Sequence, residues 1–233
     1  MMKWVSRTHV GNVRPTNQDT IILGQNLYGV ADGMGGHLAG DIASRMTGEL
    51  LAAALTGLEP RTDTLAQCVE NINAQVYDRQ MSDETLRGMG TTLTVLWEGA
   101  DSVFLAHIGD SRAYLLREGE FKQVSRDHSI VAEMMREGLL TEEEASRHPY
   151  RHMITRAVGT DPEVEADIHT LDKRPGDRWL LCSDGLTNCV PDSLLSENLA
   201  GSSLQEAADQ LMQLALTRGG QDNITLVITE VEP

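Results

Sequence analysis

Four aspartates lie at the ends of apolar, strand-like runs of the sequence, and a fifth precedes a further apolar run. They follow YGVA, LAHIG and WLLCS, and precede NITLVI and TIILG, at Asp32, Asp110, Asp184, Asp222 and Asp19 respectively. If these strands pair in sheets, their ends can converge, and carboxylates that share one cleft repel each other unless they are protonated or bridged by cations. Oxygen ligands without a cysteine or histidine cluster fit a hard ion, Mg²⁺ or Mn²⁺. The pattern therefore predicts a divalent metal site.

A glycine-rich loop, GMGGHLAG, follows Asp32 directly. Because Gly33 lacks a Cβ, its backbone can approach an ion closely enough for the carbonyl to serve as a ligand beside Asp32. Strand, glycine turn and helix are also the context of a dinucleotide cradle, but a G-x-G-x-x-G/A pattern that starts at Gly33 fails at Leu38. A metal loop is therefore the better interpretation.

Other hydrolytic and nucleotide-binding chemistries lack their motifs. No cysteine is followed six positions later by an arginine, and neither G-x-S-x-G nor G-x-x-x-x-G-K-[ST] occurs. Metal-assisted hydrolysis remains, in which water held between two ions about 3.5–4 Å apart is the nucleophile.

The charge and cysteine content limit the partners and the compartment. Nineteen Lys plus Arg against thirty-five Asp plus Glu give a net charge of −16, which repels nucleic acid and anionic membranes, so we expect neither as a partner. Cys68, Cys182 and Cys189 form no C-x-x-C pair, which favours free thiols in a reducing compartment. No signal-peptide core and no run of ~18 apolar residues is present. We expect a soluble, cytoplasmic protein.

The elements that position these residues alternate irregularly along the chain. Strands are expected over 26–31, 91–98, 102–108, 112–117, 178–183 and 223–231, with an antiparallel meander over 91–117. Helices are expected over 39–56, 62–80 and 203–218, the last opened by a capping box of Ser203 and Glu206. This order favours an α+β fold with antiparallel sheets in one domain, residues 1–233. The charged segment 128–155 is typical of a surface flap.

Several motifs in register along nearly the whole chain resemble the metal-dependent protein phosphatases, the type 2C serine/threonine phosphatases, in their compact bacterial form. They are GNVRPTNQD (11–19), VADGMGG (30–36), GMGTTLTVL (88–96), HIGDSRAYL (107–115), VSRDHSIV (124–131), ITRAVG (154–159), LLCSDGLTN (180–188) and QDNITLVI (221–228). The resemblance implies a four-layer αββα sandwich, two central antiparallel sheets flanked by helices, with the metals in a cleft at one end.

The resemblance also assigns metal ligands to five positions. Asp32 would bridge two ions, and Gly33 would give its carbonyl to one of them. Asp184 and Asp222 would hold the other ion, and Asp19 would act nearby through metal-bound water.

Further roles follow from the same resemblance. Asp110, with Asp184, would form a weaker third metal site. Gln18 stands where many relatives carry glutamate, so one acidic contact near Asp19 is missing. Arg14 would grip the phosphate, and His37 or a metal-bound water would protonate the leaving oxygen.

The function implied is hydrolysis of phosphoserine and phosphothreonine in proteins by two Mn²⁺ or Mg²⁺ ions, with in-line attack by a bridging hydroxide. The expected partners are phosphorylated proteins and a cognate serine/threonine kinase, the expected state is a monomer, and the flap, 137–152, would influence substrate choice. Two alternatives stay open: a dedicated regulator that dephosphorylates one signalling partner, and a catalytically inactive scaffold that binds metal or a phosphoprotein.

Overall fold

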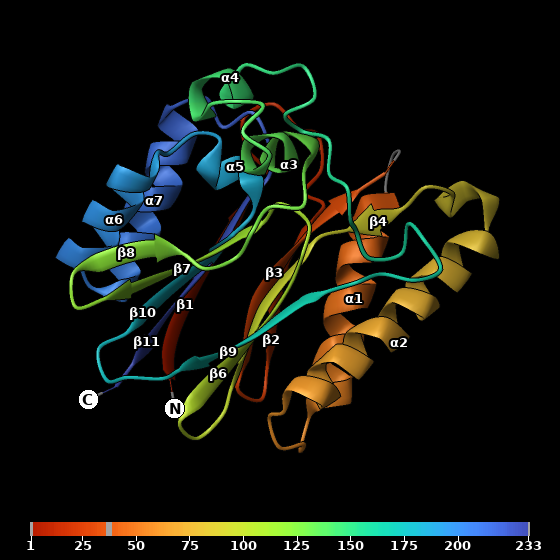
Figure 1. Ribbon diagram of the computed structural model, residues 1–233, viewed down its shortest axis with the longest axis horizontal. Coiled ribbons are helices and arrows are strands. Elements are labelled where there is room, and N and C mark those ends of the chain that lie inside the picture. Colours follow the sequence, from red (N-terminus) through yellow and green to blue (C-terminus); the bar gives the residue numbers. More distant parts are fainter. Residues whose placement is uncertain (1, 36–38, 233) are drawn as a thin grey trace.

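The apolar runs pair into two antiparallel sheets in the computed structural model, which describes residues 2–35 and 39–232 (Figure 1). The strands are β1 (Met2–His9), β2 (Asp19–Gly24), β3 (Leu27–Met34), β4 (Gly90–Thr91), β5 (Leu93–Glu98), β6 (Ser102–Ile108), β7 (Arg112–Arg117), β8 (Glu120–Gln123), β9 (Asp167–Asp172), β10 (Arg178–Cys182) and β11 (Ile224–Val231). One sheet has the order β1-β11-β10-β7-β8, and the other has the order β2-β3-β5-β6-β9 with β4 paired to β3.

Helices cover the outer face of each sheet. They are α1 (Ala39–Leu55), α2 (Thr62–Met81), the 3₁₀ helix η1 (Glu84–Leu86), α3 (Ile130–Arg136), α4 (Glu142–Ser146), α5 (Asp184–Thr187), α6 (Asp192–Gly201) and α7 (Leu204–Thr217). Figure 1 shows α1 and α2 on one flank, α6 and α7 on the other, and α3 and α4 at one end of the sandwich. The predicted four-layer αββα sandwich is confirmed.

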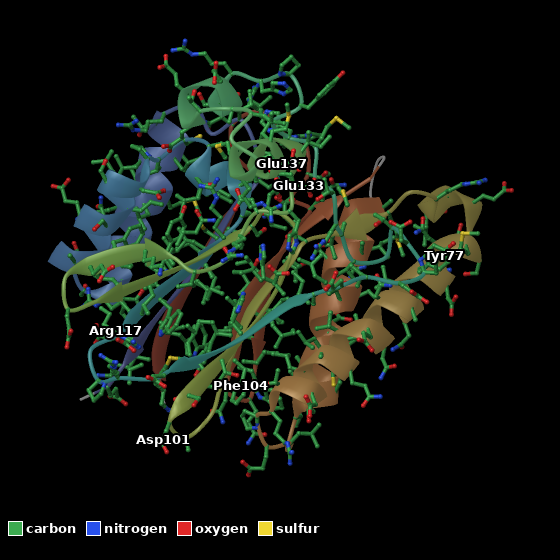
Figure 2. The ribbon with its side chains drawn as sticks, in the orientation of Figure 1. Tyr77, Asp101, Phe104, Arg117, Glu133 and Glu137 are labelled. Atoms are coloured by element: carbon green, nitrogen blue, oxygen red, sulfur yellow. The ribbon has the colours of Figure 1, made fainter. Side chains whose placement is uncertain are left out.

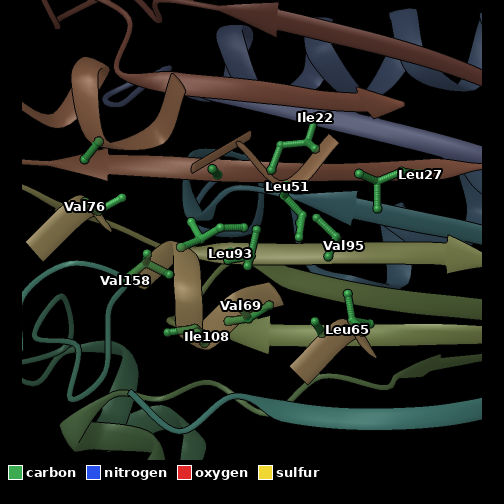
Figure 3. Close-up of a cluster of buried hydrophobic side chains, with 14 of the residues drawn as sticks. Ile22, Leu27, Leu51, Leu65, Val69, Val76, Leu93, Val95, Ile108 and Val158 are labelled. Atoms are coloured by element: carbon green, nitrogen blue, oxygen red, sulfur yellow. The ribbon is translucent and has the colours of Figure 1, made fainter. Parts of the chain in front are cut away.

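Three hydrophobic clusters occupy the three interfaces between these layers. The first joins α1 and α2 to the β2–β9 sheet; Figure 3 shows Leu51 of α1 beside Val95 of β5, and Val69 of α2 near Ile108 of β6. The second joins α5, α6 and α7 to the other sheet, and the third lies between the sheets. Because both faces of each sheet are covered, β5 is buried along its whole length and reads as an apolar run without alternation.

The six strands and three helices expected from the sequence are confirmed, and so is the capping box at Ser203 and Glu206. The expected meander over 91–117 is wrong in one respect. β6 and β7 do not pair: Gly109–Ser111 carries the chain from one sheet to the other, with Gly109 at a φ of +104° that favours glycine. This crossing leaves Asp110 at the end of the sandwich rather than in a hairpin.

Two further features of the structure concern the thiol groups and the length of the helices. Cys68, Cys182 and Cys189 are free, as expected. None of the helices in residues 2–35 and 39–232 combines the length and the apolar character needed to cross a membrane.

Candidate active site

Two of the predicted site aspartates lie opposite each other on neighbouring strands. Asp19, the first residue of β2, pairs in register with Asp32 of β3. Asp32 therefore lies inside a strand rather than beyond its end, because β3 continues to Met34 through its pairing with β4. Side chains directly opposite in an antiparallel pair are about 5 Å apart at Cβ, and like charges there are unfavourable. The fold thus places two carboxylates side by side, where their repulsion lowers the stability of the folded protein.

The backbone of Asp32 is held from both sides by threonines of the β4–β5 segment. Its N–H donates to Thr92 Oγ1 at 2.9 Å, and its carbonyl accepts from Thr92 N and from Thr91 Oγ1, each at 2.9 Å. With both main-chain groups bonded, the direction of the Asp32 side chain is set by the strand. That side chain lines the main cleft of the molecule.

Gly33 has no room for a side chain. A Cβ at this position would lie 2.1 Å from the Gly40 carbonyl oxygen and 2.6 Å from the Gln18 carbonyl oxygen. The reason for glycine is therefore the close approach of β3 to the start of α1. Gly33 was predicted on a different ground, as the donor of a carbonyl to an ion, and this packing constraint was not predicted.

Replacing Gly33 by alanine should lower the free energy of unfolding by about 3 kcal/mol, because backbone atoms of α1 and of the chain before β2 must move to admit the methyl group. Chemical denaturation measures the change. Gly201→Ala is the matched control, since a Cβ at Gly201 meets nothing within 4 Å, and it should change stability by less than about 0.5 kcal/mol. Equal stability of the Gly33 and Gly201 variants would contradict this packing argument.

The other two predicted ligands come from the second sheet. Asp184 follows the end of β10 and begins α5, where its Oδ2 accepts from Asn188 Nδ2 at 3.0 Å. Asp222 lies just before β11, and its Oδ2 accepts from Arg14 Nη2 at 2.7 Å. The Arg14 side chain is 54% exposed, so this ion pair lies at the surface of the cleft. The structure thus brings Arg14 and Asp222 together from opposite ends of the chain.

Asn223 is a site residue that the sequence analysis missed. Its Nδ2 donates to the carbonyls of Val10 and Thr16, each at 2.9 Å, and its Oδ1 accepts from Gln18 N at 2.8 Å. These bonds fasten the loop that carries Arg14 against the start of β11. The available signal was its place directly after Asp222 in the QDN motif.

A cleft of about 1030 Å³ brings most of the predicted residues together. Its lining includes Arg14, Asp32, Gly33, Asp110, Asp184 and Asp222. Asp19 does not line it; this side chain is buried, and its Oδ2 accepts from Ser183 Oγ at 2.7 Å. His37 lies outside the described residues.

The flap forms one wall of the cleft. An isolated bridge between Ser129 and Ile154 closes the base of the excursion, which carries both α3 and α4. Figure 2 shows Glu133 of α3 and Glu137, directly after that helix, at the end of the molecule opposite to Asp101.

Four carboxylates of the site hold protons more tightly than ordinary aspartates. Burial, together with the charge of Asp184, raises the pKa of Asp19 to about 6 and that of Asp110 to about 8. Burial raises the pKa of Asp32 well above its usual range, with additional effects from Asp19 and Asp184. The pKa of Asp184 is also raised, first by burial and then by Asp222. Such a group is stabilised either by protons or by cations.

The donor set fits a hard divalent ion. Asp19 Oδ1 is buried without a hydrogen-bond partner in the described residues, and four aspartates that line the cleft, Asp32, Asp110, Asp184 and Asp222, offer carboxylate oxygens. No group of three or more described His, Cys, Asp or Glu residues is arranged to hold an ion by itself. Backbone carbonyls and water must therefore complete the coordination, as Mg²⁺ and similar ions commonly require.

The whole chain is similar to bacterial serine/threonine phosphatases. A family model described as Protein phosphatase 2C matches residues 14–225. The serine/threonine protein phosphatase PstP of Mycobacterium tuberculosis is 42% identical over 237 residues, which cover 99% of this chain and 45% of that protein. This chain thus spans less than half of that relative. The serine/threonine phosphatase stp of Listeria monocytogenes is 38% identical, over 96% of this chain and 94% of that protein.

Solved structures agree with these sequence comparisons. The crystal structure of the M. tuberculosis phosphatase PstP/Ppp superposes with a TM-score of 0.94 at 40% identity, covering 100% of this chain and 99% of that one. The catalytic domain of PstP in complex with two manganese ions gives a TM-score of 0.92 at 38% identity, with coverage of 100% and 99%. The likeness therefore extends over the whole sandwich.

Proposed function

The chain belongs to the protein phosphatase 2C family, and on this premise we propose that it is a metal-dependent serine/threonine protein phosphatase. The observation that carries the proposal is the convergence of Asp32, Asp184 and Asp222 in one cleft with Arg14 at its surface. The manganese-bound relative supports the same chemistry.

The site residues have separate tasks in this proposal. Asp32, Asp184 and Asp222 would hold two divalent ions with the Gly33 carbonyl, and Asp110 with Asp184 would hold a third. When bound, the ions would supply a nucleophilic water at neutral pH and neutralise charge on the phosphoryl group. The protein keeps the carboxylates in place before any ion arrives, since Thr91 and Thr92 fix the Asp32 backbone.

Two residues act around the leaving group and the cluster. His37 would donate the proton that the leaving serine or threonine oxygen needs, a role assigned from its place after the glycine loop. Asp19, which is buried and pairs in register with Asp32, would accept hydrogen bonds from metal-bound water through Oδ1, which has no partner in the described residues, and so orient the ligands.

Arg14 would leave its ion pair with Asp222 to grip two phosphate oxygens, because a guanidinium binds a phosphate through two parallel hydrogen bonds. Arg14→Ala should therefore lower kcat/KM for a phosphopeptide about 10- to 100-fold, the equivalent of one charged hydrogen bond. Arg14→Lys should recover only part of the loss. Arg7→Ala, which breaks an ion pair with Asp209 outside the cleft lining, is the control and should leave steady-state kinetics unchanged.

The substrates in this proposal are phosphorylated proteins, with a cognate serine/threonine kinase that forms the phosphoester, and the protein acts as a monomer. The net charge of −16 opposes binding to nucleic acid. The ion is Mn²⁺ or Mg²⁺, because both prefer the oxygen donors of the cleft.

A phosphopeptide assay tests the proposal. Activity on phosphoserine and phosphothreonine peptides should vanish with EDTA and return with Mn²⁺ or Mg²⁺ in excess. Full activity in EDTA would overturn metal-dependent hydrolysis. Metal binding without turnover, with any divalent ion, would instead identify the inactive scaffold.

A further inference from the structure

His128 connects the base of the flap to the turn that carries Asp110. Its ring Nδ1 accepts from Gly109 N at 3.1 Å, and its backbone N–H donates to the Gly109 carbonyl at 2.7 Å. Its own carbonyl accepts from Thr155 N at 2.8 Å, on the returning side of the flap. A single buried residue therefore contacts the Asp110 turn and both ends of the flap.

The surroundings of the two ring nitrogens indicate which of them carries the proton in neutral His128. Nε2 lies 3.4 Å from Asp167 Oδ2 of β9, and it has no hydrogen-bond partner in the described residues. Because Nδ1 accepts from Gly109, the ring proton of a neutral His128 must be on Nε2, facing that carboxylate. Burial lowers the pKa of His128, which favours this neutral form. The negative charge of Asp167 attracts a proton at Nε2 and so favours the tautomer in which Nδ1 is free to accept from Gly109 N.

The neighbouring histidine does not contact Gly109, and it reaches the turn only through Thr94 Oγ1, which also lies 3.2 Å from the Ser111 carbonyl oxygen. His107 of β6 packs against His128 with ring centroids 4.9 Å apart, and it is fully buried. Its Nδ1 contacts Thr94 Oγ1 at 2.9 Å and its Nε2 contacts the Arg126 carbonyl at 2.9 Å. Neither of these two ring contacts is with Gly109, so His107 provides a control of similar burial for the bond from His128 to Gly109.

We propose that His128 is a positioning residue, which fixes the Gly109–Asp110 peptide through Nδ1 and thereby ties the Asp110 carboxylate to the base of the flap. The turn at Gly109 has a φ of +104° and crosses between the sheets, so no strand pairing defines its orientation. Thr92 and Thr94 hold the Ser111 end of the turn, and the bonds from His128 hold the Gly109 end. The part of this inference that concerns catalysis rests on the proposed function, through the third metal site.

Two substitutions separate the contacts of the ring. His128→Asn keeps an acceptor at the position of Nδ1 and loses the group that faces Asp167. His128→Gln keeps a polar group near the position of Nε2 and loses the acceptor for Gly109. In metal-free protein, amide hydrogen exchange by NMR should be at least about 10-fold faster at Gly109 in His128→Gln than in wild type, and close to wild type in His128→Asn.

A metal titration supplies the catalytic readout. The Mn²⁺ concentration for half-maximal phosphopeptide hydrolysis should rise about 10-fold in His128→Gln, and His128→Asn should stay within about 3-fold of wild type. His107→Gln should leave both Gly109 exchange and the Mn²⁺ requirement unchanged. Equal defects in the Asn and Gln variants of His128, or the same defects in His107→Gln, would overturn the proposal.

If a variant fails to fold, a measurement on the wild-type protein still tests the proposal. The ¹⁵N shifts of the His128 ring in metal-free wild type should report a proton on Nε2 and none on Nδ1; a proton on Nδ1 would overturn the proposal. If no protein in the series hydrolyses phosphopeptides, the proposed function fails, while the Gly109 exchange and the tautomer still decide the role of His128.

Discussion

Asp32→Asn should lower kcat for a phosphopeptide by more than about 100-fold, because loss of a ligand exceeds the 10- to 100-fold effect of losing an outer partner. The metal-free protein should at the same time become about 1–2 kcal/mol more stable, since one carboxylate leaves a buried group whose members raise one another's pKa values. Steady-state kinetics and denaturation in EDTA measure the two changes.

Mn²⁺ should then reverse the order of stability. Wild type gains about 2.7 kcal/mol at an ion concentration 100 times its Kd, and the variant gains less because it binds the ions more weakly. Asp101→Asn, at an exposed site far from the cleft (Figure 2), should match wild type in both measurements. A drop in metal-free stability for Asp32→Asn would contradict the account of repelling carboxylates.

The metal-free protein should lose about 2 kcal/mol of unfolding free energy between pH 6.5 and pH 8. Asp110 has a pKa of about 8 in the folded protein, against 3.8 for an ordinary aspartate, so the folded state binds more protons in this window than the unfolded state. Such a group contributes stability below the unfolded pKa, and that contribution is lost as pH rises through the folded pKa. Asp32 and Asp184, with raised pKa values, act in the same direction.

Burial lowers the pKa values of the buried histidines His107 and His128, so they change protonation below this pH window. Burial lowers the pKa of His107 to about 4, so its contribution changes between pH 4 and 6.5 and has the opposite sign. Denaturation in EDTA at several pH values measures the slope. Saturating Mn²⁺ should abolish it, because ions replace the protons, and Asp110→Asn should reduce it in EDTA. A slope that persists in Mn²⁺, or stability that rises with pH in EDTA, would contradict the prediction.

The strands that the sequence revealed are those inside the sheets. β3, β5, β6, β7, β10 and β11 have neighbours on both sides, and their expected positions are confirmed. The edge strands β1, β2, β8 and β9 were not predicted as strands. Edge strands carry more exposed and polar residues, as the pattern of β9 illustrates, so apolar periodicity is weak there. The pairing of Asp19 with Asp32 was missed because it depends on β2.

Residue types and spacing by themselves determined the class of chemistry. Aspartates beside apolar runs, a glycine loop that fails as a nucleotide cradle and the missing cysteine and serine motifs together indicate an oxygen-ligand metal site. These features are local, because each aspartate lies within a strand or no more than two residues from the end of one. Residue types therefore indicate which side chains could bind a metal ion, and this indication does not depend on how the strands pair.

Only the tertiary structure decided which groups meet. Arg14 reaches Asp222 across 208 positions, Asn223 clamps the loop that carries Arg14, and His128 holds Gly109 from the base of the flap. These contacts depend on sheet order and on the crossing of the chain between sheets. Side chains distant in sequence become neighbours only when the sheets pair and pack, since pairing and packing, not local propensity, bring them together.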